Sequence, residues 1–163
     1  MAFSSTATAS SDFLSLRKPP LAGSDSSLLS ERYTISLTTA DLATNTVGAI
    51  GILPAGHVPV AFELDASQLD SNGTPTLALS VGVLNSAQTA LSTATADGGA
   101  AWATGVTSVG RAAAGSASGF VASRPLKTVT PTQTDRMVGV QFTAGAATAV
   151  AGAIALTLYF RPA

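Results

Sequence analysis

Hydrophobic and polar residues alternate with a period of two over several short stretches of the chain, and no stretch shows a sustained helical period. The clearest stretch is 32–38, where Tyr33, Ile35 and Leu37 are separated by polar residues. The same alternation recurs at 58–64, 77–83, 138–142 and 154–160. Because successive side chains of an extended chain point to opposite faces, each stretch predicts a half-buried β-strand.

Three further stretches carry weaker strand signals. Residues 46–53 are apolar on both sides and include two glycines, which predicts a strand covered on both faces or bent by a bulge. Residues 101–106 and 119–122 predict short strands within a middle region that is rich in small residues. A helix over 87–96 is an alternative for part of that region, but its serines and threonines weaken it.

The turn at 70–73 has the sequence Asp-Ser-Asn-Gly, and asparagine and glycine accept a positive φ at low cost. This turn lies between two alternating stretches, so we expect those two strands to form an antiparallel pair.

Short alternating strands separated by Gly, Pro and Asn turns are typical of an all-β protein, and we predict an antiparallel β-sandwich over residues 31–163. The jelly roll is one form of such a sandwich. Residues 1–30 are rich in Ser, Thr and Ala and predict an extended N-terminal arm, with a flexible tail as the plainer interpretation. Within the arm, an apolar island followed by two cations offers partner-binding anchors: Phe13, Leu14, Leu16, Arg17 and Lys18.

Composition narrows the function. Only 10% of the 163 residues are charged and the formal net charge is -1, with no basic block, so nucleic acid is not an expected partner. The absence of cysteine excludes disulfides and thiol chemistry and fits assembly in a reducing cytoplasm. The uncharged stretch 142–160 is long enough to span a membrane, but its glycines and its strand-like second half favour a soluble segment.

The familiar catalytic motifs are each incomplete in this sequence. His57, the only histidine, lies in a turn, and no serine occupies a Gly-x-Ser-x-Gly elbow. Asp65, Asp70 and Asn72 could offer oxygens to calcium, but a self-bonded turn is the better interpretation. Glu63, Asp65, Asp70 and Asp97 give no defined carboxylate pair. We therefore predict that the chain is not an enzyme and holds no cofactor or metal.

Trp102, the only tryptophan, is expected to be a core or interface anchor more than a sugar-binding platform. The rival interpretation would use it, with the carboxylates, to recognise carbohydrate.

Specific segments carry a family resemblance. They are GILPAGHVPVAFELDASQLDSNGTPTLALSVGVLN at 51–85, TADGGAAW at 95–102, the strand that begins Asp135-Arg136-Met137, and the C-terminal Tyr159-Phe160-Arg161. Together they resemble structural virion proteins of tailed bacteriophages, and most of all the small capsid decoration, or cement, proteins. The resemblance covers about 48–161 and leaves the arm outside.

The resemblance implies a β-sandwich that binds the outside of a phage capsid and cements neighbouring subunits of the major capsid protein. It also implies a homo-oligomer, as a dimer or trimer, located on the capsid exterior of the virion and made in the host cytoplasm. The alternative function is a phage tail, head-fibre or adhesin component that binds a host surface or carbohydrate.

Overall fold

The computed structural model describes residues 28–111, 119–120 and 124–163. Over these ranges the chain forms strands and three short 3-10 helices, and no longer helix occurs in them. The strands are β1 (Leu29–Leu37), β2 (Val47–Leu53), β3 (His57–Ala66), β4 (Ala78–Val83), β5 (Ala103–Val106), β6 (Gly119–Phe120), β7 (Arg136–Ala144) and β8 (Gly152–Pro162). The helices are η1 (Thr39–Leu42), η2 (Thr95–Asp97) and η3 (Arg124–Thr128). The all-β class predicted from the sequence is confirmed.

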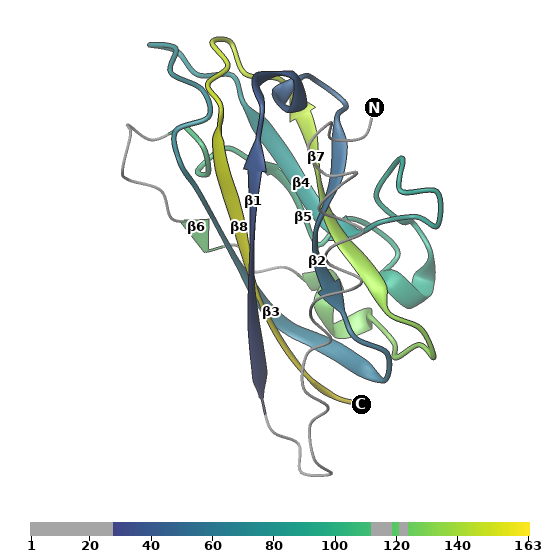
Figure 1. The fold of residues 1–163 in the computed structure, drawn as a ribbon. Helices are drawn as coiled ribbons and strands as arrows, with labels where there is room; N and C mark the ends of the chain where they lie inside the picture. The colour runs from purple at the N-terminus through teal and green to yellow at the C-terminus, as the bar shows by residue number, and fades with distance from the viewer. Residues whose placement is uncertain (1–27, 112–118, 121–123) are drawn as a thin grey trace.

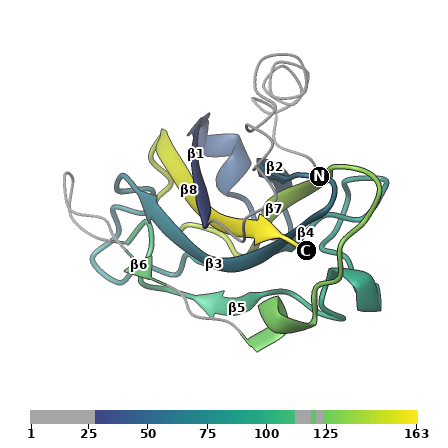
Figure 2. The ribbon, with the colours of Figure 1, turned by 90° about the horizontal axis from the view of Figure 1, so that it is seen from below.

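The strands form two antiparallel sheets that pack as a sandwich (Figure 1). The first sheet has the order β1-β8-β3-β6, and the second has the order β2-β7-β4-β5. Seen from below in Figure 2, β1 and β8 lie side by side in one sheet, and β2 and β7 lie side by side in the other. The pairing is nested, because β1 pairs with β8, β2 with β7, β3 with β6 and β4 with β5.

The predicted antiparallel pair of β3 with β4 is wrong. β3 pairs with β8 and β6 in the first sheet, whereas β4 pairs with β7 and β5 in the second, so the chain between them crosses from one sheet to the other. Both strands bury large side chains on one face, Phe62 in β3 and Leu79 in β4. Because β3 and β4 lie in different sheets, their apolar faces are covered within the core between the sheets. The turn residues alone do not specify which sheet the chain enters next.

The alternation read from the sequence matches the burial of the strands. In β8, Leu156, Leu158 and Phe160 are buried and belong to the core, while Thr157 and Tyr159 between them are partly exposed. Each buried Leu or Phe contributes roughly 1.5–3 kcal/mol relative to an exposed one. The central position of β8 between β1 and β3 explains why this strand has the strongest pattern in the chain.

β2 is buried along its whole length, and its register with β7 shifts between Ala49 and Gly51. Both features of the 46–53 prediction, cover on both faces and a bulge, are therefore present. Tyr33 of β1 donates a hydrogen bond from its hydroxyl to the Ile52 carbonyl oxygen (3.2 Å). This bond connects the edge strands of the two sheets.

Trp102 lies in the core, where it is 1% exposed, and its ring centroid is 5.9 Å from that of Phe62. Its indole N–H donates to the Asp97 carbonyl oxygen (3.1 Å), which satisfies the one polar atom of the side chain. The prediction of a core anchor is confirmed. A buried indole offers no surface on which a sugar could stack.

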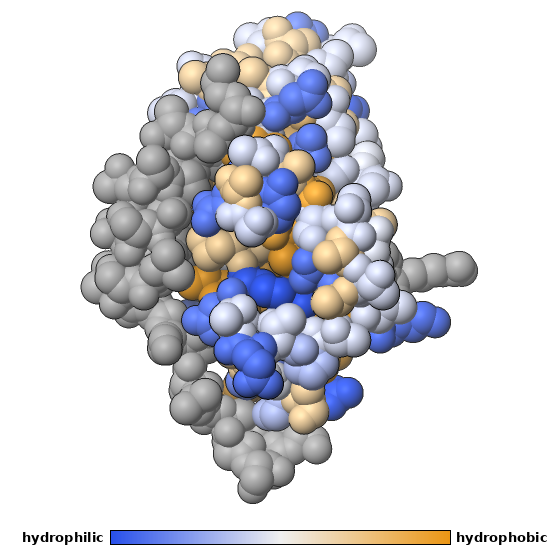
Figure 3. All heavy atoms as spheres, turned by 90° about the vertical axis from the view of Figure 1, so that its right-hand side faces the viewer, coloured by the Kyte–Doolittle hydropathy of each residue, from blue (hydrophilic) through white to orange (hydrophobic). Residues whose placement is uncertain are grey.

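The outer face of the second sheet carries a small apolar cluster of Val47, Ala49 and Leu84, with Leu91 and Met137 packed against it. Gly139 lies beneath this cluster, and a Cβ added there would come 2.5 Å from a Leu84 methyl carbon and 2.7 Å from the Gly48 carbonyl oxygen. The sheet has no side chain at this position because Leu84 occupies the space. On the side drawn in Figure 3, hydrophobic atoms are visible mainly in the recessed middle of the described surface.

The fold decides between the alternative interpretations of two segments, 87–96 and 142–160. Residues 87–96 form turns that lead into the short η2, so the helix alternative is wrong. The uncharged stretch 142–160 forms the end of β7, a loop and most of β8. Among the described residues, no helix has the length and apolar character needed to cross a membrane.

Candidate interaction surfaces

The predicted arm contacts lie outside the described residues. Phe13, Leu14, Leu16, Arg17 and Lys18 all belong to the range 1–27. Their role in binding a partner stays a prediction, and the surfaces of the sandwich itself are described below.

Asp70 is fully buried at one end of the sandwich, in the connection between β3 and β4. Its carboxylate accepts hydrogen bonds from five backbone N–H groups, which belong to Asn72, Thr76, Leu77, Ala147 and Thr148. The first three belong to its own loop, and the last two belong to the connection between β7 and β8. One side chain therefore holds two loops together.

The predicted self-bonded turn is present, since Asn72 also accepts a hydrogen bond from the Thr74 N–H (2.9 Å). What the sequence did not show is the reach of Asp70 to a loop more than seventy residues away. Burial by itself would raise the pKa of Asp70, but the backbone donors outweigh it and lower the pKa from 3.8 to about 2. The carboxylate is therefore ionised at neutral pH, and its hydrogen bonds hold the two loops together.

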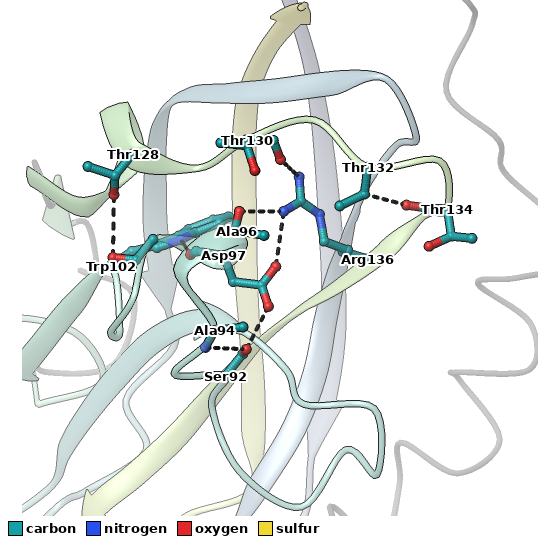
Figure 4. A network of polar contacts seen from close by, with 11 residues as sticks. Ser92, Ala94, Ala96, Asp97, Trp102, Thr128, Thr130, Thr132, Thr134 and Arg136 are labelled. Carbon is teal, nitrogen blue, oxygen red and sulfur yellow. Dashed lines mark hydrogen bonds and ion pairs between the residues drawn. The ribbon is translucent and has the colours of Figure 1, made fainter.

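A second polar network ties the opposite part of the molecule together (Figure 4). Arg136, at the start of β7, is 8% exposed; its Nη1 donates to Asp97 and to the Ala96 carbonyl oxygen, and its Nη2 donates to the Thr130 carbonyl oxygen. The ion pair between Arg136 and Asp97 measures 3.0 Å. Ser92 donates its hydroxyl to the other oxygen of Asp97 at 2.6 Å. Asp97 is therefore occupied by structural partners and is not poised for catalysis.

His57 lies at the first position of β3 and is 6% exposed. Its Nδ1 is 2.8 Å from the Ala55 carbonyl oxygen, and its ring packs edge-on against Phe160 at 5.4 Å. Among the described residues, no serine or carboxylate forms a hydrogen bond with the ring, so His57 is a packed residue without a catalytic relay in this part of the chain.

The carboxylates considered for acid–base chemistry are spread over the fold. Glu63 and Asp65 lie on the outer face of the first sheet, Asp70 lies in the loop between β3 and β4, and Asp97 is the last residue of η2. Within the described ranges, no group of three or more His, Cys, Asp or Glu residues could hold a metal ion.

The described residues also line a hollow of about 360 Å³, whose polar lining includes Asn85, Ser86, Gln88, Thr134 and Asp135. Its titratable side chains are Asp97, Asp135 and Arg136, and two of these are paired with each other. The hollow therefore presents amides, hydroxyls and one exposed carboxylate, and no nucleophile beside a base.

The outer face of the first sheet is broad, and most of its residues are small or polar. Arg32 of β1 reaches across β8 to Asp65 of β3, with the ion pair at 2.7 Å, and it also donates to the Thr157 hydroxyl of β8. The three side chains come from three adjacent strands. Arg32 is 53% exposed, so this link contributes little stability, on the order of 0–1 kcal/mol.

Toward the C-terminal end of β8, the same face becomes apolar. Val60 is 45% exposed and lies at the irregular register between Pro59 and Ala61. Ala61 pairs with Tyr159, and both are partly exposed. Leu28, just before β1, is 60% exposed. Exposed apolar side chains grouped on a sheet face are a common feature of protein interaction sites.

Comparison with known proteins gives structural matches only. No protein-family model matches the chain, and no curated protein matches it. Among solved structures, a chain described as "Capsid of Ralstonia phage GP4" is similar with a TM-score of 0.68 and 29% sequence identity, covering 91% of this chain and 92% of that one.

A second structural neighbour comes from the "Cyanophage Pam1 capsid asymmetric unit". Its TM-score is 0.54 and its sequence identity 19%, over 90% of this chain and 93% of that one. At this identity the likeness is one of fold alone.

Proposed function

We propose that the chain is a structural protein of a phage virion that binds the outer surface of the capsid and cements neighbouring subunits of the major capsid protein. The observation that carries the proposal is the similarity to a chain of the Ralstonia phage GP4 capsid, which extends over 91% of this chain in both fold and sequence. That similarity supports a structural role in a phage capsid, and the resemblance of segments 51–85 and 95–102 to decoration proteins supports the finer proposal of a cement role.

The physical character of the sandwich supports a role in packing. The buried Asp70 and Arg136, together with the mostly buried Asp97, are engaged in holding loops together, and the described residues present no group that could hold a metal ion. The nested strand order supports the jelly roll form of the sandwich. A rigid body of this kind can clamp neighbours without changing shape, and modest contacts repeated over a shell add up to strong stabilisation.

In this proposal the arm extends the contact area. The anchors Phe13, Leu14 and Leu16 would bury apolar surface against the shell, and Arg17 and Lys18 would pair with its acidic groups. The arm precedes Leu28 at the edge of the first sheet, so it would leave the sandwich beside the exposed apolar end of that sheet.

The decisive experiment adds the purified chain to expanded capsids that lack it. We expect saturable binding at a stoichiometry fixed by lattice symmetry, together with a higher melting temperature of the shell. An unrelated protein of similar size serves as the control. Absence of capsid binding, combined with binding to a glycan or a host cell surface, would refute the cement role and favour the tail, head-fibre or adhesin alternative.

A further inference from the structure

We propose that Asn72 is a site of self-modification, at which the folded chain converts this asparagine to aspartate and isoaspartate without the help of an enzyme. The site lies in the exposed segment 71–74, within the connection between β3 and β4. The proposal goes beyond the virion role and does not depend on it.

The residue that follows Asn72 makes the reaction possible. The chain contains three asparagines, Asn45, Asn72 and Asn85, and glycine follows only Asn72. Because glycine has no Cβ, its backbone nitrogen can approach the side chain of the preceding residue with little steric hindrance. A Cβ placed on Gly73 would have no atom within 4 Å, so the surroundings do not hinder this approach either.

The reaction is a cyclisation followed by a hydrolysis. The backbone nitrogen of Gly73 forms a bond to Cγ of Asn72 and gives up its proton to water. The bond between Cγ and Nδ2 breaks, and Nδ2 takes up one proton and leaves as ammonia. Water then opens the resulting succinimide ring at either of its two carbonyl carbons, which gives aspartate or isoaspartate. The attack is intramolecular, so no second reactant has to be bound before the ring forms.

A hydrogen bond in the loop favours the attack. Asn72 Oδ1 accepts a hydrogen bond from the Thr74 N–H at 2.9 Å. This bond closes one small ring that contains both Cγ of Asn72 and the Gly73 nitrogen, so the two reacting atoms are held near each other. Negative charge develops on Oδ1 as the nitrogen attacks, and an N–H donor at this distance stabilises that charge.

A second hydrogen bond lies at the leaving group. Asn72 Nδ2 donates to the Thr148 hydroxyl at 3.1 Å. When Cγ becomes tetrahedral, Nδ2 becomes an amine that accepts a proton, which the Thr148 hydroxyl can supply and regain from water. The buried Asp70 holds Thr148 beside Asn72, because one of its carboxylate oxygens accepts hydrogen bonds from the backbone N–H groups of both residues.

The fold distinguishes this site from a second pair of similar sequence. Asp97 is also followed by a glycine, Gly98. There the Gly98 N–H donates to the Thr95 carbonyl oxygen at 3.1 Å, and the Asp97 carboxylate binds Arg136. Both reacting groups are occupied, so Asp97 should not isomerise. The Gly73 N–H, by contrast, has no hydrogen-bond acceptor among the described residues, and its exposed loop admits water.

The product would alter the loop that carries it. The chain becomes one charge more negative than its formal net charge of -1, and position 72 loses its donor to Thr148. In isoaspartate the main chain also runs through the side-chain carbons, which lengthens a loop whose N–H groups bind Asp70. We therefore expect the modified protein to melt at a lower temperature than the fresh protein.

The test incubates the folded full chain at mildly basic pH and follows each asparagine by peptide mapping and mass spectrometry. Ammonia release and enzymatic methylation of isoaspartate identify the products. Asn72 should convert about tenfold or more faster than Asn45 and Asn85, because glycine follows it alone.

Variants separate the parts of the site. Gly73→Ala should slow the conversion about tenfold or more, since the methyl hinders the approach of the nitrogen. Thr148→Val should slow it about threefold or more, since it removes the proton donor at the leaving group. Thr143→Val, which changes an exposed threonine of β7, is the matched control and should leave the rate unchanged.

The same chain unfolded in urea provides the reference rate, and melting temperatures show whether each variant is folded. Conversion in urea without conversion in the folded chain would overturn the proposal, because the fold would then protect Asn72. Equal rates at the three asparagines, or rates that neither Gly73→Ala nor Thr148→Val changes, would also overturn it. Capsid binding is measured on fresh protein in a separate assay, so failure of the modification leaves the proposed function intact and failure of capsid binding leaves the modification intact.

Discussion

At the scale of single residues, the charged groups of the described structure differ in burial and in their partners. Asp70, Asp97 and Arg136 are buried or nearly so and bind backbone groups or each other, so they act in folding. Arg32 and Asp65 form an exposed ion pair, whereas Glu63 and Arg161 are exposed and take part in no ion pair among the described residues. Because only 10% of the residues are charged, each of these groups makes up a large share of the charge that the chain carries.

Asp70 should make stability depend on acidity. Its pKa is lowered from 3.8 to about 2, so its contribution is complete above about pH 4 and is lost as the pH falls toward 2. A shift of this size corresponds to about 2–3 kcal/mol of unfolding free energy. Urea unfolding measured at several pH values between 2 and 7 tests this expectation.

The variant Asp70→Asn should lose that part of the pH dependence and be destabilised at pH 7 by about 2–4 kcal/mol, because the amide nitrogen faces N–H donors. Glu63→Gln is the control, since Glu63 is exposed. A small loss of stability in Asp70→Asn, similar to that of the control, would contradict the role of Asp70 as the link between the two loops.

Gly139 gives a prediction about close packing. Gly139→Ala should cost about 1–3 kcal/mol, because the added methyl would meet Leu84 at 2.5 Å and the Gly48 carbonyl oxygen at 2.7 Å. Gly73→Ala is the matched control, since a Cβ at that position has no atom within 4 Å. Chemical denaturation compares the two, and equal stability of both variants would refute the packing argument.

At the scale of elements, the second network connects parts that the strands leave unconnected. Arg136 at the start of β7 binds η2 through Asp97 and binds the segment before β7 through Thr130. Trp102, which enters the core just before β5, donates to the same short helix. This network holds the loops at the end of the second sheet in one arrangement.

The effects of removing the two partners of this ion pair should not be additive. Arg136→Met leaves the mostly buried Asp97 without its cation and should cost about 3–5 kcal/mol. Asp97→Asn likewise leaves the buried Arg136 without its anion. The double variant should cost less than the sum of the two single variants, by about 1–3 kcal/mol. A double-mutant cycle in urea measures this coupling, and strict additivity would show that the pair is not a unit.

At the scale of the whole molecule, the arm and the sandwich should be separable. Deleting residues 1–20 removes Phe13, Leu14, Leu16, Arg17 and Lys18. We expect the melting temperature of the free protein to stay close to that of the parent, because the strands all lie beyond residue 28 in the described structure. Affinity for expanded capsids should fall about tenfold or more.

A matched variant replaces only Phe13, Leu14 and Leu16 with serine and keeps the arm at its full length. It should lose most of the same affinity, since apolar burial is the larger part of the expected contact. Unchanged capsid affinity in both variants would refute the arm assignment while leaving the sandwich as the binding body.

The alternating pattern along the chain is enough to predict most of the strands and the side of each that faces the core. Alternation marks an inward and an outward side independently of what covers them, so β1, β3, β7 and β8 and the core position of Trp102 could be predicted from local pattern. Failed motifs likewise showed that no familiar catalytic arrangement is present, because such arrangements require particular residue types.

Only the tertiary structure decided which strands meet. β3 and β4 follow each other in the chain but lie in different sheets, since pairing depends on where the apolar faces find cover. Polar contacts between residues distant in the chain likewise depend on the tertiary structure. Asp70 reaches Ala147 and Thr148, and Arg136 reaches Asp97, and no local pattern predicts either contact. Residues distant in the chain come together only through the packing of the two sheets.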